Sequence, residues 1–207
     1  ADLIAMGRAL VADPDLPNKV RDGRIDEIRR CLRCYSCQGQ MMKTRNILCT
    51  VNPVIGQEYD AKYRLPAAHK HKVAVVGGGP GGMQAAITCA QRGHEVALYE
   101  KTDALGGALK FAEHETFKHD LFRFAQWQAH QLELLKVPVH LNTEVTAELL
   151  DSLDVDTVIC AVGANPIIPS QFGIPGDNYV LGTDLFEAGV TLGKKIVIMG
   201  GGLVGCE

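Results

Sequence analysis

The sequence predicts an α/β protein, in which an irregular segment with four cysteines precedes a Rossmann-like, three-layer dinucleotide-binding domain. Two observations predict this fold class. From residue 72 onward, short apolar runs alternate with stretches of helical character, which is typical of a parallel βαβ sheet. Glycines also gather in two turns, at 77–82 and 200–205, and each turn follows an apolar run. Because the second turn repeats the first, we expect two related nucleotide-binding modules.

The same alternation places the elements of the domain. A strand is expected at 73–76, a helix over 81–92 that ends at Gly93, and a second strand at 96–99. A long helix is expected over 117–136, with one apolar face made of Phe117, Leu121, Phe124, Ala125, Leu132 and Leu135. Further strands are expected at 137–141, 157–162 and 196–199.

The first third of the chain is less regular. Residues 2–8 predict a strand ending at Gly7-Arg8, and 15–22 and 24–30 predict short helical stretches. Residues 31–65 show little periodicity, so an irregular segment held by ligands is expected there. Both ends of the sequence fall inside expected elements, which predicts that the chain is part of a longer protein.

The composition of the chain limits which partners and which cellular compartment are expected. With 46% apolar and 22% charged residues, the chain has the composition of an ordinary globular protein. Its net charge of −3 gives no electrostatic reason to expect nucleic acid or an anionic membrane as partner. No apolar run is long enough to cross a bilayer. The seven cysteines are odd in number and four cluster, which favours thiolate ligands in a reducing compartment over disulfides. A cytoplasmic location is therefore expected.

The clustered cysteines have the spacing C-x2-C-x2-C-x11-C, as Cys31, Cys34, Cys37 and Cys49. A 4Fe–4S cluster suits this spacing, because three thiolates come from one tight loop and the fourth returns from further along. Structural zinc sites more often use two separated C-x2-C pairs. Zinc and unliganded thiols remain the alternatives. The nearby basic residues either offset the charge of a thiolate-bound cluster or form a solvated face; they are Arg29, Arg30, Arg33, Lys43 and Arg45.

The first glycine turn has the G-x-G-x-x-G pattern between a strand and a helix. Gly77 permits the tight turn, Gly79 lets the backbone approach a pyrophosphate, and Gly82 lets helix and strand pack closely. We expect the pyrophosphate to lie over Gly79, Pro80, Gly81 and Gly82, where the helix N-terminus favours anions. Glu100 ends the next strand, and its carboxylate can accept hydrogen bonds from the adenosine ribose, which disfavours a 2′-phosphate.

Two further glycine segments favour FAD in this site. Gly106 and Gly107 follow the acidic strand end, where flavoproteins with two dinucleotide sites bring backbone near the cofactor, and Gly163 ends a strand in small residues. Either segment alone is also consistent with an ordinary turn.

In a complete second module, Gly200, Gly202 and Gly205 would hold the pyrophosphate of a nicotinamide cofactor. As the turn stands at the end of this chain, we do not expect it to bind. The single cysteines, Cys89, Cys160 and Cys206, are expected to be packing residues.

Taken in order, these motifs resemble the C-terminal half of the NADH:flavin oxidoreductases of the 2,4-dienoyl-CoA reductase, enoate reductase and trimethylamine dehydrogenase group. The resemblance implies that 1–24 is the tail of a TIM-barrel FMN domain and 25–68 the 4Fe–4S segment. It likewise implies that 69–193 is the FAD-binding domain and 194–207 the start of an NAD(P)-binding domain. The rest of the barrel and of the NAD(P) domain would be the chain's partners, together with a small-molecule substrate; a homo-oligomer is left open.

The resemblance also implies roles for individual residues. Gly7 and Arg8 match positions that contact the FMN phosphate, for which a guanidinium is suited. Ala108 stands where many members have Gln, so only a backbone contact to the cofactor is expected from it. Arg123 matches a basic pyrophosphate contact, and Val145 matches a position whose backbone meets adenine. No catalytic residue is assigned, because the substrate site and proton donor belong to the barrel.

The implied activity is electron transfer from NAD(P)H through FAD and the 4Fe–4S cluster to FMN, which reduces an activated C=C bond. Two alternatives are left open. One is an amine dehydrogenase of the trimethylamine dehydrogenase type, which carries ADP in place of FAD. The other is a non-enzymatic docking module in which the cysteines hold zinc. The intact second glycine fingerprint favours the reductase.

Overall fold

A computed structural model of the chain describes residues 2–60, 66–114, 116–168, 179–185 and 190–206. The chain divides into two compact units, Ala1–Gly163 and Ala164–Glu207. The first unit contains the cysteine segment and the first glycine turn, and the second contains the second glycine turn. The domain boundaries expected from the resemblance remain a prediction.

The first unit is built on a parallel sheet of four strands in the order β3-β2-β1-β4. The strands are β1 (Lys72–Val76), β2 (Glu95–Tyr99), β3 (Val139–His140) and β4 (Thr157–Cys160). Val73 pairs with Val96 on one side and with Thr157 on the other, all in parallel register. The predicted α/β fold class is confirmed. The last two strands are shorter than the 137–141 and 157–162 expected from the sequence.

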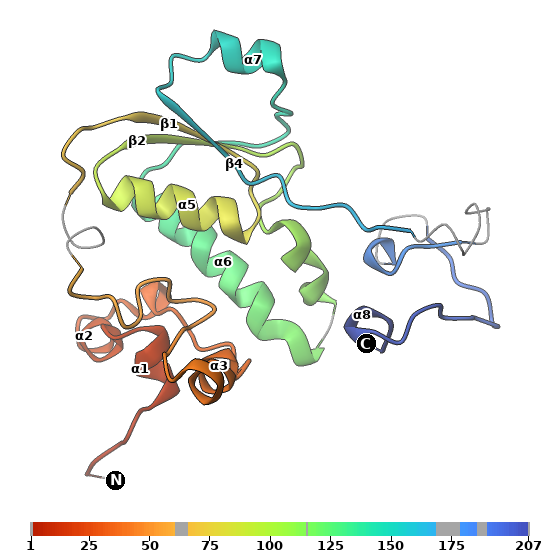
Figure 1. Cartoon of the computed structure of the whole chain (residues 1–207), viewed down its shortest axis with the longest axis horizontal. Coiled ribbons are helices and arrows are strands. Elements are labelled where there is room, and N and C mark those ends of the chain that lie inside the picture. Colours follow the sequence, from red (N-terminus) through yellow and green to blue (C-terminus); the bar gives the residue numbers. More distant parts are fainter. Residues whose placement is uncertain (1, 61–65, 115, 169–178, 186–189, 207) are drawn as a thin grey trace. The chain divides into compact units, whose positions relative to one another are not determined.

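Two helices, α5 (Pro80–Gln91) and α6 (His119–Leu134), lie on the same side of the strands (Figure 1). Val73 and Val75 alternate with Ala74 along β1, so both valines face these helices. They form a core with Val96, Leu98, Met83, Ile87 and Leu132. The expected apolar face of α6 is confirmed at Ala125 and Leu132, which are buried. Phe117 precedes the helix and is exposed, so its assignment to that face was wrong.

The N-terminal part departs from the sequence-based expectation in two places. Residues 2–6 have no regular structure and helix α1 (Arg8–Ala12) begins where the strand at 2–8 was expected to end. A strand needs a hydrogen-bonded neighbour, and none of the described residues supplies one. The supposedly irregular cysteine segment contains helix α3 (Ser36–Thr44). Helix α2 (Leu16–Arg21) is confirmed, whereas only the 3-10 turn η1 (Ile25–Glu27) forms within 24–30.

Short elements complete the chain. The 3-10 helices η2 (Gly107–Glu113) and η3 (Thr116–Lys118) precede α6, and α7 (Ala147–Ser152) is capped by the Thr146 hydroxyl, which accepts from Leu149 N. The second unit has η5 (Gly182–Asp184) and α8 (Leu203–Cys206). The strand expected at 196–199 does not form, since these residues have no neighbouring strand among those described. Across the described ranges, no helix combines the length and apolar character needed to span a membrane.

Candidate functional site

The first glycine turn connects β1 to α5, and two of its glycines are required by packing. Gly77 has φ +108°, and a Cβ on it would lie 2.3 Å from the carbonyl oxygen of Ala161. A Cβ on Gly82 would lie 1.9 Å from the carbonyl oxygen of Gly77. These distances are far below van der Waals contact, so no larger residue fits at either position without moving backbone. The turn can therefore pack this closely against the residue that follows β4 only because Gly77 and Gly82 have no side chains.

The outer side of the turn is open. A Cβ on Gly79 would meet only Gly107 Cα, at 3.9 Å, and one on Gly81 would meet nothing within 4 Å. Helix α5 begins at Pro80, with Gly79 as its N-cap and no side chain occupying the cap. The first amides of a helix have no intrahelical acceptor and lie at the positive end of the helix dipole. An anion such as a pyrophosphate fits this surface.

Glu100 lies at the end of β2, only 8% exposed, with its carboxylate against the turn. Oε2 accepts from Gly78 N at 2.6 Å, and Oε1 accepts from both the amide and the hydroxyl of Thr102 at 2.8 Å. Burial acts to raise the pKa of the Glu100 carboxyl, but the hydrogen bonds from Thr102 and Gly78 outweigh it and lower this pKa. Glu100 is therefore an ionised acceptor with lone pairs left for a ligand.

The Gly106-Gly107 segment packs directly on the turn. Gly106 N donates to Gly78 O at 2.9 Å, and a Cβ on Gly107, where φ is +51°, would lie 2.8 Å from Gly79 Cα. The two glycine segments therefore lie against each other, and their approach to a cofactor stays a prediction. Ala108 follows at the exposed start of η2.

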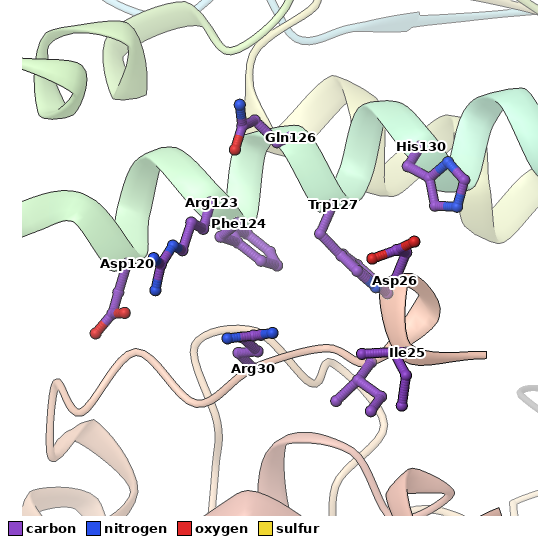
Figure 2. A pocket seen from close by; sticks show the side chains of 10 residues that line it. Ile25, Asp26, Arg30, Asp120, Arg123, Phe124, Gln126, Trp127 and His130 are labelled. Atoms are coloured by element: carbon purple, nitrogen blue, oxygen red, sulfur yellow. The ribbon is translucent and has the colours of Figure 1, made fainter. Parts of the chain in front are cut away.

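The remaining predicted nucleotide contacts lie in different places. Gly163 follows β4 with φ +79° and has open space around it. Val145 is half-buried in the loop between β3 and α7. Arg123 projects from α6 into a pocket shared with residues 25–30, which contains no residue of the turn (Figure 2). Their contacts with a nucleotide stay predictions.

The four clustered cysteines line a single pocket, together with residues that include Arg8 and Tyr35. Among the described residues, no three His, Cys, Asp or Glu side chains are close enough to hold one metal ion. Tetrahedral zinc, with Zn–S bonds of about 2.3 Å, needs its sulfurs in near contact. A cubane spreads its four thiolates around a larger body, so four cysteines that line one pocket without close contact suit a cluster better than zinc. The cluster itself stays a prediction.

The cysteine loop has an unusual backbone. Arg33 and Tyr35 both have φ +57°, the left-handed region that disfavours residues with a Cβ. This conformation directs Arg33 N toward Cys31 Sγ, at 3.4 Å. Burial acts to raise the pKa of the Cys34 thiol, but hydrogen bonds with Ser36 and Thr50 lower it, which favours the thiolate. Strained backbone of this kind is found at ligand sites.

The basic residues around the loop have separate environments. Arg29 is half-buried: its amide donates to Asp13 Oδ2 and its Nε to Ala12 O, both at 2.8 Å. Burial lowers the pKa of its guanidinium, while Asp13 and Cys49 act to raise it. Arg33 forms an ion pair with Asp120 of α6. Arg30, Lys43 and Arg45 are exposed, so only part of the basic set is a solvated face.

Arg8 begins α1, and its guanidinium lies 4.4 Å from the ring centroid of Tyr35. The predicted phosphate ligand is thus held against the cysteine loop, on the wall of the cysteine pocket. Gly7 is exposed and a Cβ on it would meet nothing within 4 Å. Their contact with an FMN phosphate stays a prediction.

The second unit repeats the geometry of the first turn. Gly200 has φ +114°, and a Cβ on Gly205 would lie 2.0 Å from Gly200 O. Gly202, like Gly79, has open space around it. Of the single cysteines, Cys89 packs against the core and burial raises the pKa of its thiol. Cys160 and Cys206 are exposed, so the expectation of packing roles is wrong for these two.

Helix α6 joins the two candidate sites, which the sequence did not reveal. Trp127 Nε1 donates to Glu27 O at 2.9 Å, next to the cysteine segment. The following residue, Gln128, is buried and its Nε2 donates to Pro80 O at 3.0 Å, at the glycine turn. Two features of the sequence could have indicated this role of α6. Trp127 is the chain's single tryptophan, and Gln128 is a polar residue between the apolar residues Ala125 and Leu132 of the same helix.

A parallel sheet, a glycine turn at a helix N-terminus and an acidic strand end define a dinucleotide-binding protein of the flavoprotein type. Residues 71–207 match the family described as pyridine nucleotide-disulphide oxidoreductase, and the chain belongs to this family.

Comparison with single proteins also confirms the resemblance to NADH:flavin oxidoreductases. The whole chain is 42% identical to an NADH oxidase of Thermoanaerobacter brockii and 37% identical to a cinnamate reductase of Clostridium sporogenes, covering 33% and 31% of them. A structure of 2-naphthoyl-CoA reductase, 34% identical, superposes with a TM-score of 0.87 over 99% of this chain and 31% of that one. The chain thus spans about a third of the length of the relatives it matches.

Proposed function

We propose that this chain is the electron-transfer part of an NAD(P)H-dependent flavin and iron–sulfur oxidoreductase. The observation that carries the proposal is the position of α6, whose adjacent residues Trp127 and Gln128 hold the cysteine segment and the glycine turn. The two candidate cofactor sites are therefore built in one compact unit. Such an arrangement is what transfer of electrons between two bound groups requires.

The residues of the chain have distinct tasks in this function. The open surface of Gly79 and Gly81 at the start of α5 would hold the pyrophosphate of FAD, and Glu100 the adenosine ribose. Cys31, Cys34, Cys37 and Cys49 would hold a 4Fe–4S cluster as thiolates. FAD, when bound, supplies hydride acceptance from NAD(P)H and release of single electrons. The low pKa of Glu100 keeps this residue an acceptor at neutral pH.

For the whole protein we propose electron flow from NAD(P)H through FAD and 4Fe–4S to FMN, with reduction of an activated C=C bond of the enoate or dienoyl-CoA type. The names of the cinnamate and 2-naphthoyl-CoA reductases support this substrate class. Gly7 and Arg8 would contact the FMN phosphate in a barrel domain of which residues 1–24 are the tail, and Gly200, Gly202 and Gly205 would contact NAD(P)H. The domain boundaries at 24, 68 and 193, and a cytoplasmic location, belong to the same proposal.

The proposal is tested by iron, sulfide and flavin analysis of the full-length protein and of two matched variants. Cys37→Ser removes one corner ligand and is expected to abolish or severely reduce the iron and sulfide content and the visible cluster absorbance. Cys89→Ser, at a packing residue of α5, is expected to leave all three unchanged. Full iron and sulfide in Cys37→Ser would refute the ligand set.

The same analysis separates the two alternatives. Zinc in place of iron would identify a docking module. A colourless nucleotide released from the first turn, in place of FAD, would identify the amine dehydrogenase type. The chain of residues 1–207 alone is expected to show no NAD(P)H-dependent enoate reduction, because the proposed substrate site lies in the barrel domain.

A further inference from the structure

A pocket of about 430 Å³ lies between α6 and residues 25–30 (Figure 2). Its ten lining residues include none of the clustered cysteines and no residue of the glycine turn or of the Gly106-Gly107 segment. It is therefore separate from both sites described above. Its volume falls in the range of pockets that bind small molecules, about 300–1,000 Å³.

One wall of the pocket is aromatic. The rings of Phe124 and Trp127 project from successive positions of one α6 face and stack with centroids 5.8 Å apart and planes 11° apart. The indole is fixed in place, because its Nε1 donates to Glu27 O and the guanidinium of Arg29 lies 5.4 Å from its ring centroid. A fixed pair of parallel rings is a surface for apolar or aromatic contact that loses little entropy on binding.

Two guanidinium groups enter the pocket from opposite walls. Arg123 extends from α6, and Arg30 rises from the segment that faces it (Figure 2). Neither has a hydrogen-bond or ion-pair partner in the described part of the chain. Unpaired guanidinium groups bind carboxylates through two parallel hydrogen bonds.

The charges around the pocket select the kind of anion. The carboxylate of Asp120 is already paired with Arg33, so these two charges cancel. Asp26 is the remaining acidic residue in the lining, against the two arginines, which leaves an excess of one positive charge. This excess suits a ligand with a single negative charge better than a phosphate monoester or a pyrophosphate.

We propose that this pocket binds a small planar aromatic monocarboxylate, with the ring against Phe124 and Trp127 and the carboxylate between Arg30 and Arg123. Two features carry the proposal. The stacked rings form one wall of the pocket, and the two unpaired guanidinium groups extend into the pocket from opposite walls. The proposal does not depend on FAD or the cluster being present, since no clustered cysteine and no residue of the first glycine turn lines the pocket.

The test is calorimetric titration of the full-length protein with benzoate, with cyclohexanecarboxylate, benzamide and AMP as matched probes. Benzoate is expected to bind with saturation and more tightly than the other three. Arg30→Gln and Arg123→Gln, both at exposed residues, are each expected to weaken benzoate binding at least about tenfold, the loss expected for a hydrogen bond to a charged group. Lys136→Gln, an equal charge change outside the pocket, is expected to leave the affinity unchanged.

The aromatic wall has its own variant. Phe124→Leu keeps an apolar side chain but removes the ring, and is expected to reduce the preference for benzoate over cyclohexanecarboxylate. The proposal is overturned by absence of saturable benzoate binding, by benzoate affinity that neither arginine variant changes, or by tighter binding of AMP than of benzoate. Loss of iron or flavin in any variant would concern the proposed function and not this pocket, because benzoate binding is measured separately.

Discussion

The carbonyl oxygen of Gly77 lies 1.9 Å from the place that a Cβ on Gly82 would occupy. Gly82→Ala therefore forces the backbone of the turn to move, and the same methyl group would also press on Ala161 at 3.3 Å. We expect a loss of about 1–3 kcal/mol in the free energy of unfolding, the usual cost of overpacking. Denaturant unfolding of the protein without nucleotide measures this loss directly.

Gly81→Ala is the matched control for this change. The position lies in the first turn of α5 and a Cβ on it would meet nothing within 4 Å. Because alanine favours the helix by up to about 1 kcal/mol over glycine, stability is expected to stay equal or rise. Equal destabilisation by both substitutions would show that the contact with Gly77 is not the cause.

A second prediction concerns the pH dependence of stability. The pKa of Glu100 in the folded protein is lowered from its ordinary value of 4.5. Its ionised form therefore stabilises the fold above that pH, and this contribution is lost as the pH falls through the lowered pKa. Glu100→Gln is expected to lose about 1.5–3 kcal/mol at neutral pH, the range for hydrogen bonds to a charged group.

Unfolding curves at several pH values check this prediction. The difference between the wild type and Glu100→Gln should shrink as the pH is lowered below 4.5. Glu95→Gln, at the exposed start of β2, is the control and should show a small difference at every pH. A Glu100→Gln deficit that stays constant down to low pH would contradict the assignment.

A third prediction uses the same residue in nucleotide binding. Glu100 lies against Gly78, so the 2′-phosphate of NADP at this site would meet a second anion, whereas the ribose hydroxyls of FAD meet an acceptor. Glu100→Ala is expected to weaken FAD by about 1.5–3 kcal/mol, or more than tenfold. Titration of the nucleotide-free protein decides this. Unchanged FAD affinity, or tighter binding of NADP than of FAD in the wild type, would refute the site.

A fourth prediction concerns backbone strain after α3. Arg45 ends this helix with φ +60°, a conformation that costs a residue with a Cβ about 1–2 kcal/mol and glycine far less. Arg45→Gly is therefore expected to raise the free energy of unfolding by about 1 kcal/mol. Arg45→Ala removes the same side chain and keeps the Cβ, so it should give no such gain. Thermal unfolding of the two variants side by side separates strain from charge.

Local patterns in the sequence were sufficient to predict the first glycine turn and the acidic strand end. The turn at Gly77–Gly82, the strand before it and Glu100 after the next strand are set by backbone conformation and short-range pairing, which the residue types report. Contacts between distant segments were not predictable. Arg33 pairs with Asp120, and Trp127 with Glu27, across separations that no local pattern encodes.

The errors have related physical causes. A strand was expected at 2–8 because the run is apolar, but a strand exists only when a neighbour accepts its hydrogen bonds. Helix α3 was missed because it is short and mostly polar, which leaves no clear helical period. Its flanking residues Tyr35 and Arg45 are left-handed, and neither is a residue type that usually marks a helix end.

The last prediction tests the link that α6 makes between the two candidate sites. Trp127→Phe keeps an aromatic ring on the helix but removes the hydrogen bond to Glu27 O. That oxygen also accepts from Lys19 Nζ at 3.0 Å, so it stays paired and the loss of stability should be small, about 0.5–1 kcal/mol. Trp127→Ala also removes the ring and its contact with Arg29, and should cost clearly more stability.

The iron content and the FAD affinity of the two variants measure the link itself. We expect the iron content and the FAD affinity to fall in Trp127→Ala and to stay near the wild-type values in Trp127→Phe. A Trp127→Ala protein that keeps full iron and unchanged FAD affinity would show that α6 does not hold the two sites together.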